Sequence, residues 1–558
     1  MTSAEREKAT PMTESSLGST VREWIEHDPD PETVAELKAC SDDELEERFA
    51  RPLTFGTAGL RGPLRGGPDG MNLAVVLRTT WAVAQVLKER DHAGSRVVVG
   101  GDARHGSETF ALAAAEVLAA QGFMVTLMFA AVPTPVVAFG ARHLGASAGI
   151  QITASHNPSS DNGYKVYFEG GFQIVSPTDR EIEAMIRKAP HADQIPRAAV
   201  QTSGMDLIQR YVDRTSHVRR THGSARLVFT AMHGVGGEYA LDAFVRAGFS
   251  DVQVVESQFA PDPDFPTVPF PNPEEPGATD ELLKLAADTE AEVAIALDPD
   301  ADRCAVGVPT PDGWRMLSGD ETGWLLGDYI LSQIDPGEVS EHTVVASSVV
   351  SSRMLSRIAA AHGARHAETL TGFKWLSRAD GDLPGCTLVF AYEEAIGYCV
   401  DPSAVRDKDG ISTAVLFCDL VVALREQGRT VLEALDDLAR MHGVHATTAV
   451  SRPVACADEA AEVMTRLRSK PPTKLCGFDV TMTDLAAVRP YERRTDGVIL
   501  EGGDGGTAVR VAVRPSGTEP KVKSYIEVRR KCVDGDVTAA RAQARLLAEE
   551  LAELAGRF

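Results

Sequence analysis

The chain has 558 residues, of which 43% are hydrophobic and 24% charged, and its 48 Gly and 31 Pro are too few for a collagen-like or disordered chain. At ~150 residues per domain, this length predicts an ordered protein of roughly four domains. The 56 Lys and Arg against 80 Asp and Glu leave a net charge of −24, which repels phosphate backbones and anionic headgroups. We therefore expect neither nucleic acid nor a membrane as a main partner.

Cysteine usage and the N-terminus predict a cytoplasmic protein. The eight cysteines form no CxxC and no metal-type spacing with His, which is typical of a compartment where thiols stay reduced. The polar first 18 residues predict a loose tail without signal peptide or anchor. The uncharged stretch 122–141 is long enough for a bilayer, but Pro133 and Pro135 interrupt it, so a strand, a turn and the start of a helix explain it better.

Strand-like runs that precede helical runs predict parallel α/β layers over most of the chain. The clearest unit is a strand at 96–101 and a helix at 109–121 with Ser107 as its N-cap. Similar strands are expected at 148–153, 227–232, 293–297, 343–347 and 387–392. Ligands in open α/β sheets bind at the C-terminal strand ends, so the loops that follow these strands are the candidate sites.

From about residue 446 the sequence pattern changes to segments in which apolar and polar residues alternate, followed by a final helix from about Val537. This pattern predicts a separate α+β domain. The proline-rich stretch 261–276 is read as a long surface loop inside one domain, because strands flank it on both sides. The expected division is an N-terminal extension at 1–50, α/β domains at 51–204, 205–318 and 319–445, and the α+β domain at 446–558.

Three loops carry residues suited to phosphoryl chemistry. In GIQITASHNPSSDNGYKVY (149–167), Ser155 follows a strand as an exposed serine on a tight turn, and Lys165 could neutralise a phosphoryl oxygen; a purely structural turn is the alternative. In ALDPDADRC (296–304), the alternate residues Asp298, Asp300 and Asp302 can converge on a hard cation such as Mg²⁺, unless the turn is simply solvated.

The third loop is RPSGTEPKVK (514–523), where hydroxyls, backbone N–H groups and cations suit a phosphate dianion. A hairpin with ordinary exposed charges is its alternative. Two weaker segments are TFGTAGLRG (54–62), which holds Arg61 but lacks the GxGxxG spacing, and YEEAIGY (392–398), which pairs Glu393 with Glu394. His233, like His156, is expected at a strand end, where a lone His is more often structural.

The motifs TASHNP, DPDADR, GFKW, EEAIGY and RPSGTEPK occur in this order, and together they resemble the α-D-phosphohexomutase superfamily, most closely its phosphoglucomutase-2-like and phosphopentomutase branch. The likeness runs from about residue 50 to the end. It implies three similar α/β domains and a TATA-binding-protein-like α+β domain around a central cleft. It also implies a reaction through a phosphoserine and a sugar bisphosphate, which serves as activator, in a monomer or dimer acting on sugar phosphates.

The resemblance assigns a role to each matching residue. Ser155 would be phosphorylated and would hold Mg²⁺ together with Asp298, Asp300 and Asp302. The residues facing the reacting oxygen or proton would be Arg61, His156, Lys165 and Lys408, and those binding substrate would be Arg303, Gly372, Phe373, Lys374, Glu393, Arg514, Ser516, Gly517 and Thr518.

One position departs from the family pattern: the hexose enzymes commonly carry a serine where this chain has Ala395. A missing hydroxyl contact weakens discrimination between sugars. Interconversion of glucose 1-phosphate and glucose 6-phosphate is the expected activity, with phosphopentomutase, phosphomannomutase and sugar bisphosphate synthase as alternatives. A sugar-phosphate-binding protein without turnover, or a phosphatase that uses Asp298 as nucleophile, are further alternatives.

Overall fold

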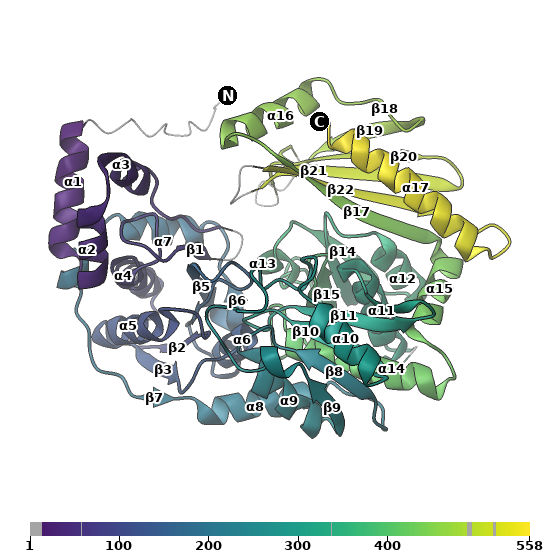
Figure 1. Ribbon diagram of the computed structural model, residues 1–558, viewed down its shortest axis with the longest axis horizontal. Coiled ribbons are helices and arrows are strands. Elements are labelled where there is room, and N and C mark those ends of the chain that lie inside the picture. The colour runs from purple at the N-terminus through teal and green to yellow at the C-terminus, as the bar shows by residue number, and fades with distance from the viewer. Residues whose placement is uncertain (1–13, 57–58, 336, 488–493, 517–520) are drawn as a thin grey trace.

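Within the described residues, the chain forms four β-sheets in sequence order, three that combine parallel and antiparallel pairs with helices around them and a last one that is antiparallel (Figure 1). The structure is a computed structural model that describes residues 14–56, 59–335, 337–487, 494–516 and 521–558. The predicted α/β architecture with a different C-terminal domain is confirmed. None of the helices in these ranges combines the length and apolar character that a bilayer crossing needs.

The first sheet has the order β1-β5-β4-β2-β3-β7, with β6 beside β5. Its strands are β1 (Leu60–Pro63), β2 (Arg96–Gly101), β3 (Met124–Met128), β4 (Ala148–Ile152), β5 (Asp161–Phe168), β6 (Phe172–Gln173) and β7 (Thr202–Ser203). Its helices are α4 (Leu73–Glu89), α5 (Ser107–Ala120), α6 (Thr134–His143) and α7 (Thr178–Ile186). The strands at 96–101 and 148–153 were predicted almost to the residue.

Two expectations about this region were wrong. Helix α1 (Glu14–His27) begins inside the expected tail and packs with α2 (Pro31–Ala39) and α3 (Asp42–Ala50) through a cluster around the buried Leu37, while residues 1–13 lie outside the described part. Ser107 is not the N-cap of α5, because Gly106 takes that position. The Ser107 hydroxyl instead donates to Asp102 Oδ1 at 2.6 Å.

The second sheet has the order β12-β11-β10-β8-β9. Its elements are β8 (Arg226–Thr230), β9 (Asp251–Val254), β10 (Val293–Leu297), β11 (Cys304–Thr310), β12 (Gly313–Met316), α8 (Met205–Ser216), α9 (Gly236–Arg246) and α10 (Asp280–Asp288). Strands β8 and β10 are parallel neighbours, so the proline-rich segment 261–276 lies within one domain, as predicted. It is not wholly on the surface, because Phe265 and Val268 are buried.

The third sheet has the order β14-β13-β15-β16. Its elements are β13 (Thr343–Ser348), β14 (Arg365–Thr369), β15 (Thr387–Glu393), β16 (Gly397–Cys399), α11 (Gly319–Ser332), α12 (Met354–His362), α13 (Phe373–Leu376), α14 (Gly410–Glu426) and α15 (Val431–His442). Helix α14 is buried from Gly410 to Leu424, as expected of a helix that is apolar on all sides. It packs against β10 and β11, so one core joins the second and third sheets.

The fourth sheet is antiparallel throughout, in the order β17-β22-β21-β20-β19-β18. Its elements are β17 (Val444–Pro453), β18 (Lys474–Leu475), β19 (Phe478–Asp484), β20 (Val498–Gly503), β21 (Thr507–Pro515), β22 (Lys521–Arg530), α16 (Ala457–Ser469) and α17 (Val537–Ala555). Figure 1 shows α16 and α17 on the side of this sheet that faces away from the third domain. Toward the third domain, Ile499 and Ala512 pack on Val349 and Val350.

Candidate active site

The site forms where the loop after β4 meets the loop after β10. Ser155 has a positive φ of 56°, which turns its side chain out of the strand direction, and its hydroxyl donates to Asp298 Oδ2 at 2.8 Å. This contact joins two loops that are 143 residues apart in sequence. The expectation of an exposed serine was wrong: Ser155 is only 1% exposed, because the aspartate loop of the second domain covers it.

The three predicted aspartates do converge. Asp298, Asp300 and Asp302 are each 0% exposed, and one carboxylate oxygen from each lies within 4.8 Å of the other two. Lys165 Nζ on β5 contacts Asp300 Oδ2 and Asp302 Oδ2, both at 2.7 Å. The opposite oxygens, Oδ1 of Asp300 and Oδ1 of Asp302, are buried and have no hydrogen-bond partner.

The electrostatics of this cluster depend on neighbouring charges. Burial and the charges of Asp300 and Asp302 raise the pKa of Asp298 well above its usual range. Burial opposes ionisation of Asp302, but Lys165, Lys408 and Arg303 outweigh it and lower the pKa of that carboxyl. The three carboxylates converge, and two of their buried oxygens have no hydrogen-bond partner. Because Mg²⁺ prefers oxygen ligands, this arrangement fits such a divalent cation.

Three further predicted residues border the same point. His156 Nδ1 lies 3.2 Å from Ser155 Oγ, and burial together with the cations Arg303 and Arg61 lowers the pKa of this imidazole well below 6.5. Arg61 on β1 donates to Asn157 Oδ1 at 3.3 Å, while its Nε is buried without a partner. Arg303 Nε lies 3.9 Å from Asp298 Oδ2. The structure therefore brings all three to the serine–aspartate cluster.

The third domain places further charged residues beside the aspartate cluster. Lys408, buried at 5% exposure, lies 3.4 Å from Asp302 Oδ2, and the carboxylates of Asp302, Asp407 and Glu393 outweigh burial and raise its pKa. Glu393 is a neighbour of both Lys408 and Arg303, and burial raises the pKa of its carboxyl despite these cations. Its partner in the sequence motif behaves differently, because Glu394 Oε2 accepts from two serine hydroxyls of the same domain.

The GFKW segment splits into separate environments. Gly372 has a φ of 101°, which favours glycine at this turn into α13. Phe373 is 2% exposed in the domain core, and its ring lies 5.5 Å from Lys408 Nζ. Lys374 Nζ donates to the carbonyl of Gly56 at 3.3 Å, so it contacts the turn before β1.

The candidate phosphate loop follows β21. The Arg514 guanidinium donates to the Thr371 hydroxyl at 2.8 Å, next to Gly372, and the Ser516 amide donates to the carbonyl of Lys521 at 2.8 Å. Gly517 and Thr518 lie outside the described residues. His233 is not part of the site, because its Nε2 pairs with the Thr267 hydroxyl at 2.9 Å, as the structural interpretation expected.

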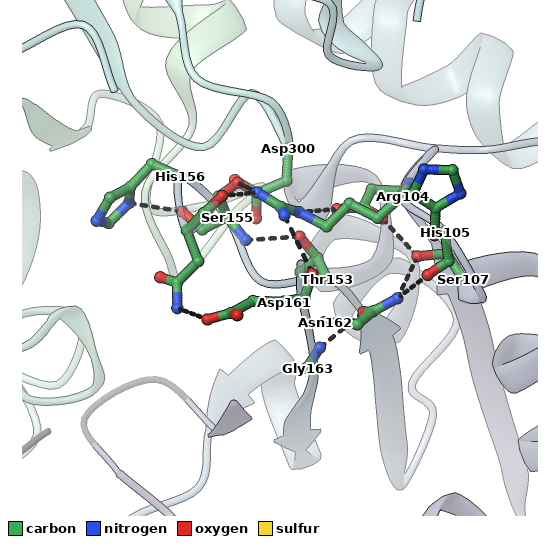
Figure 2. A network of polar contacts seen from close by, with 12 residues as sticks. Arg104, His105, Ser107, Thr153, Ser155, His156, Asp161, Asn162, Gly163 and Asp300 are labelled. Atoms are coloured by element: carbon green, nitrogen blue, oxygen red, sulfur yellow. Dashed lines mark hydrogen bonds and ion pairs between the residues drawn. The ribbon is translucent and has the colours of Figure 1, made fainter. Parts of the chain in front are cut away.

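Sequence reasoning missed two residues that hold the site. Arg104, buried at 4% exposure, donates to the carbonyls of Ser155 and Asn157 at 2.7 and 2.6 Å, and it also reaches the carbonyls of Pro158 and Asp161 (Figure 2). The Thr134 hydroxyl donates to Asp300 Oδ2 at 2.5 Å. The available signal was position alone, since each follows the end of a predicted strand.

Comparisons with known proteins agree with this geometry. Three models of one family match the chain: domain I of phosphoglucomutase/phosphomannomutase over residues 52–193, domain II over 209–313 and domain III over 318–441, each described as alpha/beta/alpha. Among solved structures, the open form of the Paramecium phosphoglucomutase parafusin is similar with a TM-score of 0.68 at 20% identity, over 90% of this chain and 95% of the other. That likeness concerns the fold.

Named relatives are also similar over most of their length. A Haemophilus influenzae protein named "Probable phosphomannomutase" is 40% identical over 83% of this chain and 94% of its own. The phosphopentomutase of Mus musculus is 34% identical, over 92% and 90%, and the glucose 1,6-bisphosphate synthase of Homo sapiens is 32% identical, over 96% and 93%. The chain therefore belongs to the phosphoglucomutase/phosphomannomutase family and is an isomerase of the phosphosugar mutase class.

Proposed function

We propose that this enzyme moves a phosphoryl group between two oxygens of one aldose monophosphate, with glucose 1-phosphate and glucose 6-phosphate as the expected pair. The observation that carries the proposal is the 2.8 Å contact between Ser155 Oγ and Asp298, beside aspartates that Lys165 bridges. A hydroxyl fixed among cations and carboxylates is suited to carry a phosphoryl group, since positioning and charge stabilisation dominate such transfers.

The reaction consists of two phosphoryl transfers. In the first, the bond between phosphorus and Ser155 Oγ breaks and a bond between phosphorus and a free sugar hydroxyl oxygen forms. The proton of that hydroxyl passes to a nearby base, and Ser155 Oγ takes up a proton to become a free hydroxyl. The resulting sugar bisphosphate turns around and returns its other phosphate to Ser155 by the reverse step. Free sugar bisphosphate acts as activator, because it phosphorylates any empty Ser155.

The chain's own residues have distinct tasks in this proposal. Mg²⁺ would be held by Asp298, Asp300, Asp302 and an oxygen on Ser155, and when bound it neutralises charge on the phosphoryl group. Lys165 and Arg61 orient the phosphoryl oxygens. His156, kept neutral by its lowered pKa, borders the reacting oxygen without adding a positive charge.

The sugar is held from the other domains. Arg303, Glu393 and the turn of Gly372, Phe373 and Lys374 would bind its hydroxyls or orient it, and Lys408 would face the reacting hydroxyl as a cation or proton carrier. Arg514 and Ser516 would hold the phosphate that is not reacting, and Gly517 and Thr518 remain sequence-based predictions. The near-complete burial of Ser155 supports exclusion of water, which would otherwise hydrolyse a phosphoserine.

A pentose phosphate is the second candidate substrate. Ala395 offers no hydroxyl to a hexose, and relatives 34% identical to this chain are named phosphopentomutase and phosphoribomutase. Mannose 1-phosphate follows from the phosphomannomutase name of another relative. Release of the bisphosphate as end product, the activity in the name of the synthase relative, is the least expected outcome.

The test combines one variant with a substrate panel. Ser155→Ala removes the phosphoryl carrier, so we expect turnover to fall to background and the mass of one phosphoryl group to disappear from the intact protein. A Ser159→Ala variant, changed in the same loop outside the cluster, is the control. Full activity of Ser155→Ala would overturn the mechanism. Assaying the 1-phosphates of glucose, mannose, ribose and deoxyribose, with kcat/KM compared, identifies the substrate.

A further inference from the structure

A hollow outside the candidate active site lies between the start of α12 and the sheet face of the fourth domain. Its volume is about 390 Å³, and its charged lining comes from Arg353, Arg357, His445, Arg510, Glu527 and Arg529, with Glu501 at one edge. None of these residues belongs to the serine–aspartate cluster or to the candidate phosphate loop. The volume is in the range of small-molecule sites.

Buried polar groups in this hollow lack partners. The side chain of Arg510 is 6% exposed, and its Nε has no hydrogen-bond partner. The Nε of Arg529 is likewise buried without one. The His445 side chain is 1% exposed; its Nδ1 contacts Glu527 Oε1 at 2.7 Å, which leaves Nε2 without a partner. A buried N–H donor that makes no hydrogen bond is costly, so the two arginine Nε groups favour a ligand that accepts hydrogen bonds from them.

The charge around the hollow points to an anion. Four arginines face the carboxylates of Glu501, Glu527 and the adjacent Glu368, in a chain whose net charge is −24. Burial lowers the pKa of Arg510 and the like charge of Arg353 adds to this, while the carboxylates of Glu368, Glu527 and Glu501 act in the opposite direction. Burial and the charge of Arg357 lower the pKa of Arg529 in the same way. An added anion would relieve this repulsion.

Domain docking does not account for the whole cluster. Two sets of contacts at the hollow join the fourth domain to the third. Arg510 donates to the carbonyl of Val349, and Glu527 Oε1 accepts from the Ser352 hydroxyl and the Arg353 amide at 2.5 and 2.9 Å. Arg353 further pairs with Glu501 at 3.1 Å. In the ranges that the structure describes, Arg357 and Arg529 form no ion pair, so their charges exceed what docking requires.

We propose that this hollow binds a phosphate-type oxyanion, either free phosphate or the phosphate of a small phosphorylated metabolite, at a site separate from the catalytic cleft. Guanidinium groups suit this ligand because they donate parallel hydrogen bonds to two oxygens. Arg510 and Arg514 lie four residues apart on β21, and side chains alternate along a strand, so both are on the same face. The hollow is thereby joined to the candidate phosphate loop by one continuous strand.

The test is calorimetric titration of inorganic phosphate into the intact enzyme. The wild type is expected to bind phosphate at two sites. In the double variant Arg357→Ala/Arg529→Ala, the Kd of one of these sites should rise at least tenfold. Arg365→Ala/Arg545→Ala, which removes the same charge from exposed arginines outside the hollow, should keep both sites. Arg514→Ala should weaken the other site. A pocket double variant that binds phosphate like the wild type overturns the proposal.

Two further measurements keep the result decisive. If the double variant unfolds at a lower temperature, the single Arg357→Ala, at an exposed position, must still weaken the same site. Titration with glycerol 2-phosphate separates the two ligand sources. If it binds the Arg357-dependent site more tightly than phosphate does, the ligand is a phosphorylated metabolite, and if it binds more weakly, the ligand is free phosphate. If neither compound binds this site, the proposal is overturned.

Discussion

The first and last junctions between domains in this enzyme are built differently. Between the first and second domains, Lys165 and Thr134 contact Asp300 at 2.7 and 2.5 Å, and the joint is fully buried. Between the third and fourth domains, an apolar patch that includes Ala512 lies beside the polar network of Glu527. The first joint fixes the reacting groups at hydrogen-bond distance. The second junction joins the third domain to the sheet whose strand β21 leads into the candidate phosphate loop, and apolar packing contributes to it.

We expect the largest losses of activity and stability from a change at Asp302, where the junction between the first and second domains has several charged groups in contact. Asp302 accepts from Lys165 at 2.7 Å and lies 3.4 Å from Lys408. In Asp302→Asn, the two lysines lose their shared carboxylate, so we expect kcat to fall by about 10²–10³-fold and the free energy of unfolding by roughly 3 kcal/mol. Steady-state kinetics over a Mg²⁺ series and urea unfolding measure both.

The control for this change is Asp312→Asn, at an exposed turn of the same domain. Asp312→Asn should leave both quantities within error. Wild-type activity in Asp302→Asn would mean that the buried joint positions nothing essential, and the contrast between the two junctions would lose its basis.

The next effect concerns the loop rather than the charge. Arg104 holds four carbonyls of the Ser155 loop, which a lysine cannot do with one ammonium group. We expect Arg104→Lys to lower kcat about 10²-fold with little change in KM, since a small displacement of the nucleophile slows transfer. Arg180→Lys, at an exposed position of the first domain, is the control. A change in KM alone would indicate a role in binding instead.

At the second junction we expect an effect on stability before activity. Burial would raise the pKa of Glu527, but His445, Ser352 and Arg510 outweigh it and lower the pKa to about 2. A pKa depressed by two units or more corresponds to roughly 3 kcal/mol, which is present above pH ~4.5 and lost as the pH falls toward 2. Glu527→Gln should therefore unfold more easily at pH 7 and lose this acid dependence.

Urea unfolding at pH 7 and at pH 3, compared with Glu549→Gln on the exposed face of α17, measures this difference. A Glu527→Gln enzyme that keeps the wild-type pH profile of stability would show that the carboxylate does not secure the fourth domain. The two junctions would then be less different than their contacts indicate.

The sequence predicted the elements and the chemistry better than the environment of each residue. The strands at 293–297 and 387–393 and the convergence of the aspartates follow from apolar runs and alternate spacing, which are local signals. The burial of Ser155 and the role of Arg104 depend on contacts across more than 50 residues, which no local pattern encodes. Ser107 was misassigned for a different reason: its hydroxyl donates to Asp102, only five residues earlier, and Gly106 takes the N-cap position.

The smallest expected effect tests the loop that lies near both junctions. Ala395 follows Glu393, which neighbours Arg303 and Lys408, and Glu394, whose charge also reaches Tyr525 of the fourth domain. If the missing hydroxyl relaxes sugar choice, Ala395→Ser should add one hydrogen bond, worth about 1 kcal/mol, and raise the hexose-to-pentose ratio of kcat/KM roughly fivefold. Ala404→Ser, at another half-buried alanine, should leave the ratio unchanged. An unchanged ratio in Ala395→Ser would place sugar discrimination elsewhere, and the second junction, where Arg514 of the candidate phosphate loop contacts Thr371, would then be the better candidate for it.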